Sequence, residues 1–188
     1  MSVRIDRLDN GLTVATERME SLGSTALGLW IEAGGRHEAP DQNGVAHFLE
    51  HMAFKGTERR SAADIAIEIE NVGGYLNAYT SRETTAYYAR VLPEDAALAL
   101  ELLGDIVRRP AFAADEIAVE RSVILQEIGQ ALDTPDDVIF DWLQEASYPG
   151  QPIGRPILGP AERVSRFADA DLRGFVGAHY APGRMILA

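Results

Sequence analysis

The alternation of apolar and polar residues predicts a set of short strands in the first half of the chain. Asp9-Asn10-Gly11 is a tight-turn signal between the first two, so the chain is expected to open with a β-hairpin. The last two strands are rich in β-branched and aromatic residues and flank Arg82-Glu83. The predicted strands cover residues 4–8, 12–16, 25–33, 75–81 and 84–92.

Apolar positions spaced three and four residues apart predict helices between and after these strands. Ser61 with Asp64 is an N-cap signal for one of them. In another, Phe140, Trp142 and Leu143 are expected to pack against the domain rather than to contact a ligand. The predicted helices cover residues 44–55, 61–72, 94–107, 115–132, 136–147 and 166–179.

The order of these elements predicts a two-layer α+β domain, in which helices pack mainly on one face of an antiparallel-dominated sheet. Residues 148–159 are rich in glycine and proline and are expected to be the least structured part of the chain. Residues 184–188 look like the start of a further strand.

Composition limits the classes of function. With 188 residues, 46% hydrophobic and 24% charged, the chain is long enough for one substantial core. It has no cysteine, which excludes disulfides and thiolate zinc sites. The net charge of −12 argues against a nucleic-acid partner and favours basic peptides. No segment resembles a signal peptide or a membrane span, so we expect no membrane partner and a cytoplasmic location.

The segment from Gly44 to Lys55, GVAHFLEHMAFK, carries the strongest chemical signal. His47 and His51 are four residues apart, which places two imidazoles on one face of a helix at the spacing needed to bind one metal. Glu50 lies just off that face, where it can reach a water beside the metal. This is the His-Glu-x-x-His zinc motif with the glutamate moved before the second histidine. The alternative is an ordinary helix with a coincidental pattern.

A zinc site that leaves a position open to water needs a third protein ligand, and two histidines with one carboxylate are a common hydrolytic set. Glu120 and Glu127 lie seven residues apart on the helix predicted at residues 115–132, and so share a face beside an apolar stripe. The stripe consists of Ile117, Val123, Ile124 and Ile128. Burying a glutamate there is costly unless it is paired or metal-bound. From the residues alone, the alternative that both glutamates face solvent stays open.

Three segments resemble the marker segments of the pitrilysin-like (M16) family of inverted-motif zinc peptidases, in particular its mitochondrial processing peptidase-like branch. They are GVAHFLEHMAFKGT at residues 44–57, GGYLNAYTSRETTAYYARVL at residues 73–92 and ERSVILQEI at residues 120–128. The similarity extends from about Leu8 to the last residue. No catalytic position of the family pattern is substituted, which argues against an inactive subunit.

The resemblance implies one zinc ion per chain, held by His47, His51 and Glu127. Glu127 follows His51 by 76 residues (127 − 51), and the family's third ligand lies at such a distance. The resemblance also implies that Glu50 is the general base and that Glu120 is a supporting acidic residue near the site.

The segment matching Asn77, Ala78, Tyr79 and Thr80 is implied to form an exposed sheet edge, where the substrate peptide adds as an extra strand. Pairing of this kind holds a peptide by its backbone and makes little demand on its sequence. Considered without the resemblance, these residues favour a simple structural hairpin.

By the same resemblance, residues 1–188 are the N-terminal catalytic domain of a longer peptidase, truncated in the last strand, with the C-terminal partner domain absent. The implied function is that of a zinc metalloendopeptidase acting on short or unfolded peptides, as a homodimer or as a heterodimer with a homologous subunit. Two alternatives stay open. One is a non-catalytic scaffold subunit of the same fold, and the other is a metal-independent module that binds peptides at residues 77–80.

Overall fold

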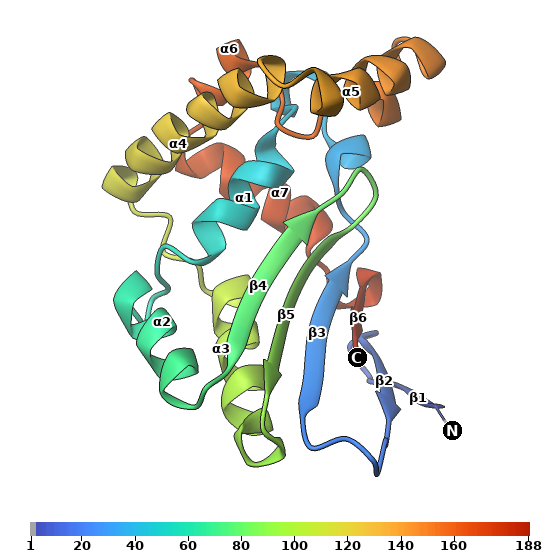
Figure 1. Cartoon of the computed structure of the whole chain (residues 1–188), viewed down its shortest axis with the longest axis vertical. Coiled ribbons are helices and arrows are strands. Elements are labelled where there is room, and N and C mark those ends of the chain that lie inside the picture. The colour runs from blue at the N-terminus through green and yellow to red at the C-terminus, as the bar shows by residue number, and fades with distance from the viewer. Residues whose placement is uncertain (1–2) are drawn as a thin grey trace.

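The computed structural model describes residues 3–188, which form one sheet with helices over one of its faces (Figure 1). The strands are β1 (Val3–Arg7), β2 (Thr13–Glu17), β3 (Thr25–Ile31), β4 (Tyr75–Thr80), β5 (Thr85–Val91) and β6 (Met185–Leu187). They lie in the order β1-β2-β6-β3-β5-β4. β2 and β6 are parallel, and the other neighbouring strands are antiparallel.

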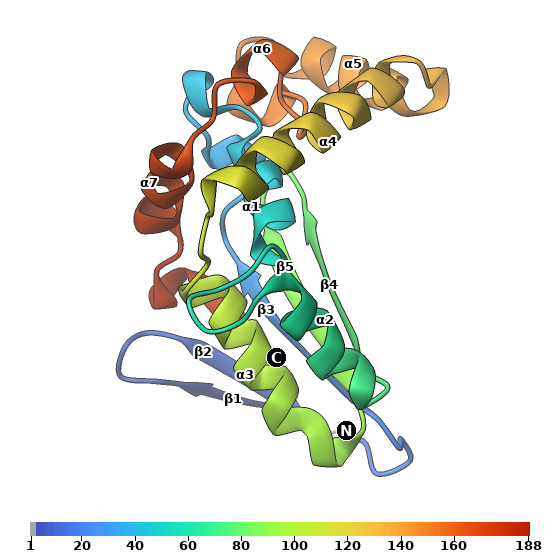
Figure 2. The same cartoon turned by 90° about the vertical axis from the view of Figure 1, so that its left-hand side faces the viewer.

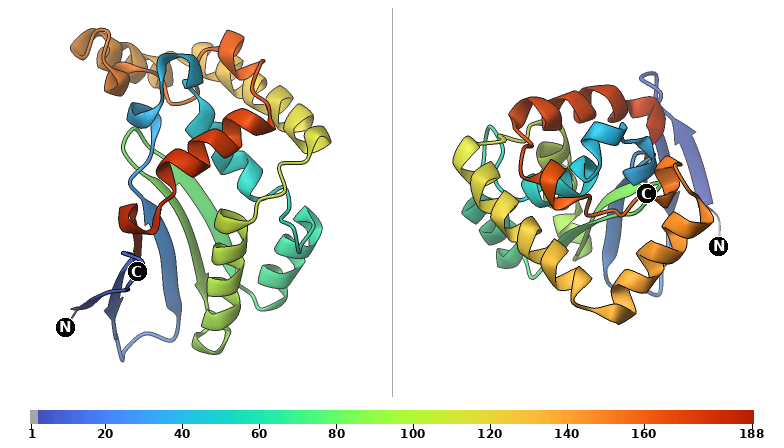
Figure 3. Two further views of the ribbon diagram at one scale, coloured as in Figure 1. Left: turned by 180° about the vertical axis from the view of Figure 1, so that it is seen from behind. Right: turned by 90° about the horizontal axis from the view of Figure 1, so that it is seen from above.

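The helices are α1 (Val45–Ala53), α2 (Ala62–Asn71), α3 (Ala96–Arg108), α4 (Ala114–Leu132), α5 (Pro135–Ser147), α6 (Ala161–Val164) and α7 (Asp169–His179). α1, α2, α3 and α7 lie on the same side of the sheet (Figures 1 and 2). α4 and α5 together bend around one end of the domain (Figure 3). The predicted α+β class, with an antiparallel-dominated sheet and one helical layer, is confirmed.

The core forms where the apolar sides of α1 and α3 meet the sheet. Phe48 and Met52 point inward from α1, and Leu102 and Ile106 do so from α3; all four are at most 1% exposed. The members of each pair are four residues apart and therefore share a helix face. Burying side chains of this size stabilises the fold by about 1.5–3 kcal/mol each. The packing fixes the rotation of α1 and leaves His47 and His51 on the side away from the core.

Two local signals in the sequence are confirmed. The opening hairpin turns at Asn10, whose side-chain oxygen accepts a hydrogen bond from the Leu12 amide, and Gly11 has the left-handed φ of +92° that its turn requires. α2 begins with a reciprocal capping box in which Ser61 and Asp64 each accept a hydrogen bond from the other's backbone amide.

The expected packing of α5 is wrong. Phe140, Trp142 and Leu143 are 66%, 60% and 60% exposed, and only Val138 of this helix is buried. The apolar pattern was correct for a helix, but within residues 3–188 the helix contacts mainly α4 and the segment after it, so most of its apolar surface stays uncovered.

The helical layer differs from the prediction in two details, the start of the last helix and the buried stripe of α4. The last helix begins at Asp169 rather than at residue 166: Ala168 has extended backbone angles and is the N-cap, and its amide donates to the Asp171 carboxylate. In α4, Val123 does not belong to the buried stripe and is 37% exposed. The stripe that packs consists of Ile117, Ile124 and Ile128.

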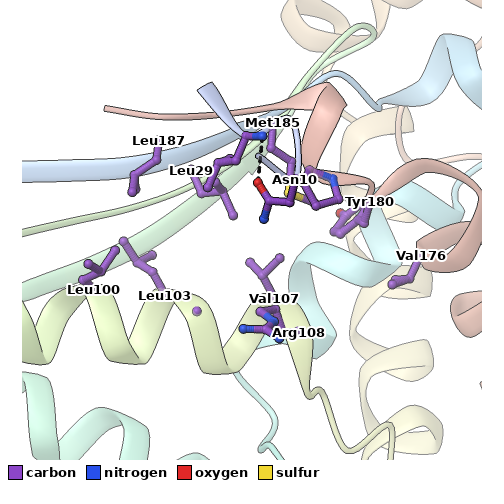
Figure 4. Close-up of a pocket in the computed structure, with 13 residues that line it drawn as sticks. Asn10, Leu29, Leu100, Leu103, Val107, Arg108, Val176, Tyr180, Met185 and Leu187 are labelled. Atoms are coloured by element: carbon purple, nitrogen blue, oxygen red, sulfur yellow. Dashed lines mark hydrogen bonds between the residues drawn. The ribbon is translucent and has the colours of Figure 1, made fainter. Parts of the chain in front are cut away.

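A pocket of about 470 Å³ lies between α3, α7 and the sheet (Figure 4). Leu29, Leu103, Val107 and Met185 give it an apolar lining. None of the residues predicted to bind metal or peptide lines it, so it is separate from the chemistry considered below. No helix within residues 3–188 is long and apolar enough to cross a bilayer.

Candidate metal centre

The centre begins on α1, which carries the His-x-x-Glu-His segment. The buried side chains of Phe48, Leu49 and Met52 hold this helix on the core. His47 and His51 therefore project from its other side, with 13% and 18% of their side chains exposed. The centroids of their rings are 4.7 Å apart, so the two imidazoles lie side by side on one helix face, as the spacing in the sequence predicted.

The second half of the centre comes from α4, which packs across α1 (Figure 2). The buried stripe of α4 turns Glu120 and Glu127 toward α1. Glu120 is 4% exposed, and the side chain of Glu127 is 38% exposed. The alternative in which both glutamates face solvent is therefore excluded.

Glu127 is the carboxylate that meets both histidines. Its Oε2 atom lies 3.8 Å from His47 Nε2 and 3.5 Å from His51 Nε2. One donor atom from each of the three residues can be chosen so that all lie within 4.8 Å of one another. Two imidazole nitrogens and one carboxylate oxygen, converging from two helices, form a donor set that suits zinc.

Glu120 has a different position, behind His51. Its Oε2 atom lies 2.9 Å from His51 Nδ1, and its Oε1 atom lies 2.6 Å from Lys55 Nζ. Burial by itself would raise the pKa of Glu120, but the hydrogen bonds from Lys55 and His51 outweigh burial and hold that pKa below its ordinary value. The carboxylate therefore accepts the Nδ1 proton of His51, and Nε2 is the ring nitrogen that faces Glu127.

His47 has a neutral imidazole, the form that binds a metal. Burial, together with the nearby His51, lowers the pKa of His47 to about 4, so its imidazole is neutral near pH 7. Its Nδ1 atom is buried and has no hydrogen-bond partner among residues 3–188. Within residues 3–188, no hydrogen bond on that side of the ring orients it, so its placement relies on packing and on the backbone of α1.

Glu50 lies on α1 between the two histidines and is half-buried. Its negative charge, added to the larger effect of burial, contributes to the raised pKa values of Tyr87 on β5 and of Tyr180 after α7, the latter reaching about 12. The carboxylate is therefore near the sheet side of α1, one residue before the ligand candidate His51.

The segment predicted to bind peptide forms β4, the outermost strand on this side of the described sheet. Asn77 and Tyr79 are exposed and point to the open face, whereas Ala78 is 7% exposed and faces the helices. The hydroxyl of Thr80 donates to the backbone oxygen of Ala46 at 3.4 Å, beside His47. An outer strand thus runs directly alongside the helix that carries the histidines.

Two residues of this region went unrecognised in the sequence. Lys55 lies just after α1 and pairs with Glu120; its position four residues after His51, one helical turn further on, could have indicated this. Glu38 lies buried beneath the start of α1, and the only available signal was a glutamate a few residues before a predicted helix.

We expect Glu120→Gln to weaken zinc binding by about 10- to 100-fold without unfolding the domain, because the amide cannot hold the His51 tautomer as the carboxylate does. Competition with a zinc indicator would measure this. Glu116→Gln, on the same helix, is the matched control and should bind zinc like the parent chain. Unchanged affinity in Glu120→Gln would show that Glu120 has no influence on the centre.

A helix bearing His-x-x-Glu-His, facing a second helix that supplies a glutamate, is the arrangement of inverted-motif zinc peptidases. The sequence model of the family described as insulinase (peptidase family M16) matches residues 13–161. The chain therefore belongs to peptidase family M16, whose members include metallopeptidases, and the resemblance inferred from the three marker segments is confirmed.

Curated relatives agree with this assignment. The chain is 45% identical over 185 residues to the mitochondrial-processing peptidase subunit beta of Saccharomyces cerevisiae, covering 98% of this chain and 40% of that protein. It is 46% identical over 184 residues to an uncharacterized zinc protease of Rickettsia felis, covering 98% of this chain and 45% of the relative. The chain thus spans less than half the length of these relatives.

Solved structures share the fold. A protease from Helicobacter pylori superposes with a TM-score of 0.93 at 24% identity, over 99% of this chain and 45% of that one. A structure described as the inactive domain of an M16 peptidase from Pseudomonas fluorescens gives the same TM-score at 22% identity, over 100% of this chain and 46% of that one. A protease and a domain described as inactive therefore share this architecture. Only the side chains of the centre can distinguish a catalytic domain from an inactive one.

Proposed function

We propose that the chain is the catalytic domain of a zinc-dependent endopeptidase that hydrolyses short or unfolded peptides. The observation that carries this proposal is the convergence of His47, His51 and Glu127 from two helices, with donor atoms within 4.8 Å of one another. Three ligands leave a coordination position for water or substrate, which distinguishes a catalytic zinc site from a closed structural one.

In this proposal His47, His51 and Glu127 hold the metal, which would act as a Lewis acid toward the scissile carbonyl and make water more acidic. Glu50 takes a proton from the attacking water and delivers it to the leaving amine. Glu120, fixed by Lys55, keeps His51 oriented. No covalent intermediate with the protein is required.

The substrate is proposed to bind along β4. The outer edge of this strand offers backbone groups to a peptide that adds as a further strand, at Asn77, Ala78, Tyr79 and Thr80. Such pairing selects extended chains, so a folded protein would be a poor substrate. The net charge of −12 favours basic peptides by long-range attraction.

A homologous partner is part of the proposal, either a second copy or a related subunit, because several relatives are named as the beta subunit of a processing peptidase. Within the cell we propose a cytoplasmic location. The competing function is a scaffold or peptide-binding subunit, and the shared fold of a domain described as inactive favours keeping it as the second candidate.

The decisive test is zinc content together with peptide cleavage by the metal-free and the zinc-reconstituted protein. We expect about one zinc ion per chain, and cleavage of an unstructured basic peptide that a chelator removes and zinc restores. Zinc bound without cleavage, in the full-length protein with its partner, would favour the scaffold. Peptide binding that zinc does not affect would favour the metal-independent module.

A further inference from the structure

Glu38 is a buried carboxylate with no part in the mechanism above. It lies in the short connection after β3 and is 3% exposed. A glutamate at such a depth is stable only when hydrogen bonds or charges compensate for the loss of water. The hydrogen-bond donors to its carboxylate lie just before α1 and in its first turn, and the charge of Arg155 also acts on it.

Both carboxylate oxygens are used. The Oε2 atom accepts hydrogen bonds from the Gly44 amide and from Asn43 Nδ2, each at 2.9 Å. The Oε1 atom accepts one from the Ala46 amide, also at 2.9 Å. The first amides of a helix have no partner within it, and the helix dipole favours a negative charge at that end. Glu38 therefore fixes the first turn of α1 from outside the helix.

A second segment closes over the same turn. Arg155 Nη1 donates to the backbone oxygen of Glu38 at 3.0 Å, and Asn43 Nδ2 also donates to the Pro156 oxygen at 3.0 Å. Residues 148–159, expected to be the least structured part of the chain, contain only the short 3-10 turn Pro152–Gly154, but they are held against the segment just before α1.

The contact is close enough to require glycine on both sides. A Cβ atom on Gly159 would lie 2.4 Å from the Asn43 oxygen, and one on Gly44 would lie 2.7 Å from the Leu158 oxygen. Both glycines have left-handed φ values, +73° and +101°. The backbone on either side of the contact therefore has little freedom to shift.

We propose that Glu38 is a positioning residue for the metal centre, because it fixes the backbone of the first turn of α1, next to His47, so that His47 meets Glu127. The inference rests on the proposed function only in taking His47 as a ligand. His51 is oriented by Glu120, whereas among residues 3–188 the ring of His47 has no hydrogen-bond partner on its Nδ1 side. The placement of His47 therefore relies more on its backbone, which Glu38 holds one residue earlier at Ala46.

The test is titration of the metal-free protein with Co²⁺, whose visible absorption reports the geometry of its ligands. We expect Glu38→Gln to weaken Co²⁺ binding by about tenfold and to change the shape of the absorption band. Groups that orient metal ligands typically change metal affinity by about 10- to 100-fold, and the expected effect is at the lower end of this range. The glutamine amide brings hydrogens toward backbone amides that need an acceptor. Arg155→Ala, which leaves the carboxylate in place, should shift the affinity in the same direction by a smaller factor.

Ser61→Ala is the matched control, since it removes the cap of α2 and should reduce stability without disturbing α1. Its Co²⁺ affinity and spectrum should equal those of the parent chain. Parental binding and spectra in both Glu38→Gln and Arg155→Ala would overturn the positioning role, and so would an equal loss in Ser61→Ala. If the parent chain itself bound no Co²⁺, the proposed metal site would fail first, and the positioning role with it.

Discussion

Replacing Glu50 by glutamine is expected to reduce peptide cleavage by about 10²- to 10⁴-fold, the range attributed to a positioned general base. Glutamine has nearly the same shape but cannot accept the proton of the attacking water. Because Glu50 is not among the three proposed ligands, the variant should still bind zinc like the parent chain. Initial rates on an unstructured peptide, with zinc content measured on the same sample, would separate the two effects.

Glu58→Gln is the control for this substitution, since Glu58 is an exposed glutamate just beyond the same helix. It should leave both the rate and the zinc content unchanged. Parental turnover in Glu50→Gln would remove Glu50 from the mechanism. Loss of zinc in that variant would instead indicate that the residue is needed for the architecture of the centre.

Glu127→Gln is expected to empty the centre of zinc. Glu127 supplies the only carboxylate of the three-residue donor group, and the two histidines that remain lie on one helix and cannot enclose the metal. Zinc at about 100 times its dissociation constant stabilises a protein by about 2.7 kcal/mol. The parent chain should therefore melt roughly 5–10 °C higher with zinc than without it, and the variant should lose this difference.

Glu145→Gln, an exposed position on α5, should keep both the zinc content and the thermal shift. The metal-free melting temperature of Glu127→Gln should be close to that of the metal-free parent chain, because the side chain is partly exposed and contributes little to the core. Retention of zinc at parental affinity in Glu127→Gln would mean that α4 does not provide the third ligand.

These two substitutions matter because the fold alone does not decide activity. A domain described as inactive has the same TM-score to this chain as a protease does. Activity depends instead on the side chains of Glu50 and Glu127. A superposition of backbones does not measure their chemistry.

The sequence by itself determined the local features. The Asn10 turn, the Ser61 cap and the rotation that puts His47 and His51 on one face all follow from interactions within a few residues along the chain. The motif, the α+β class and the family followed from the same short-range patterns. Helical period also placed Glu120 and Glu127 on one face, although it left open whether that face meets solvent.

Only the tertiary structure decided how these pieces meet. The packing of α4 across α1 brings Glu127 to the two Nε2 atoms and sends Glu120 to Nδ1 of His51, a distinction that depends on how the two helices cross. The same holds for α5, which has a helical pattern but little in the described chain to pack against, and for Glu38. Its carboxylate is satisfied by backbone amides whose positions depend on the folded chain. Contacts between distant segments are set by the shape of the whole core, which no local pattern encodes.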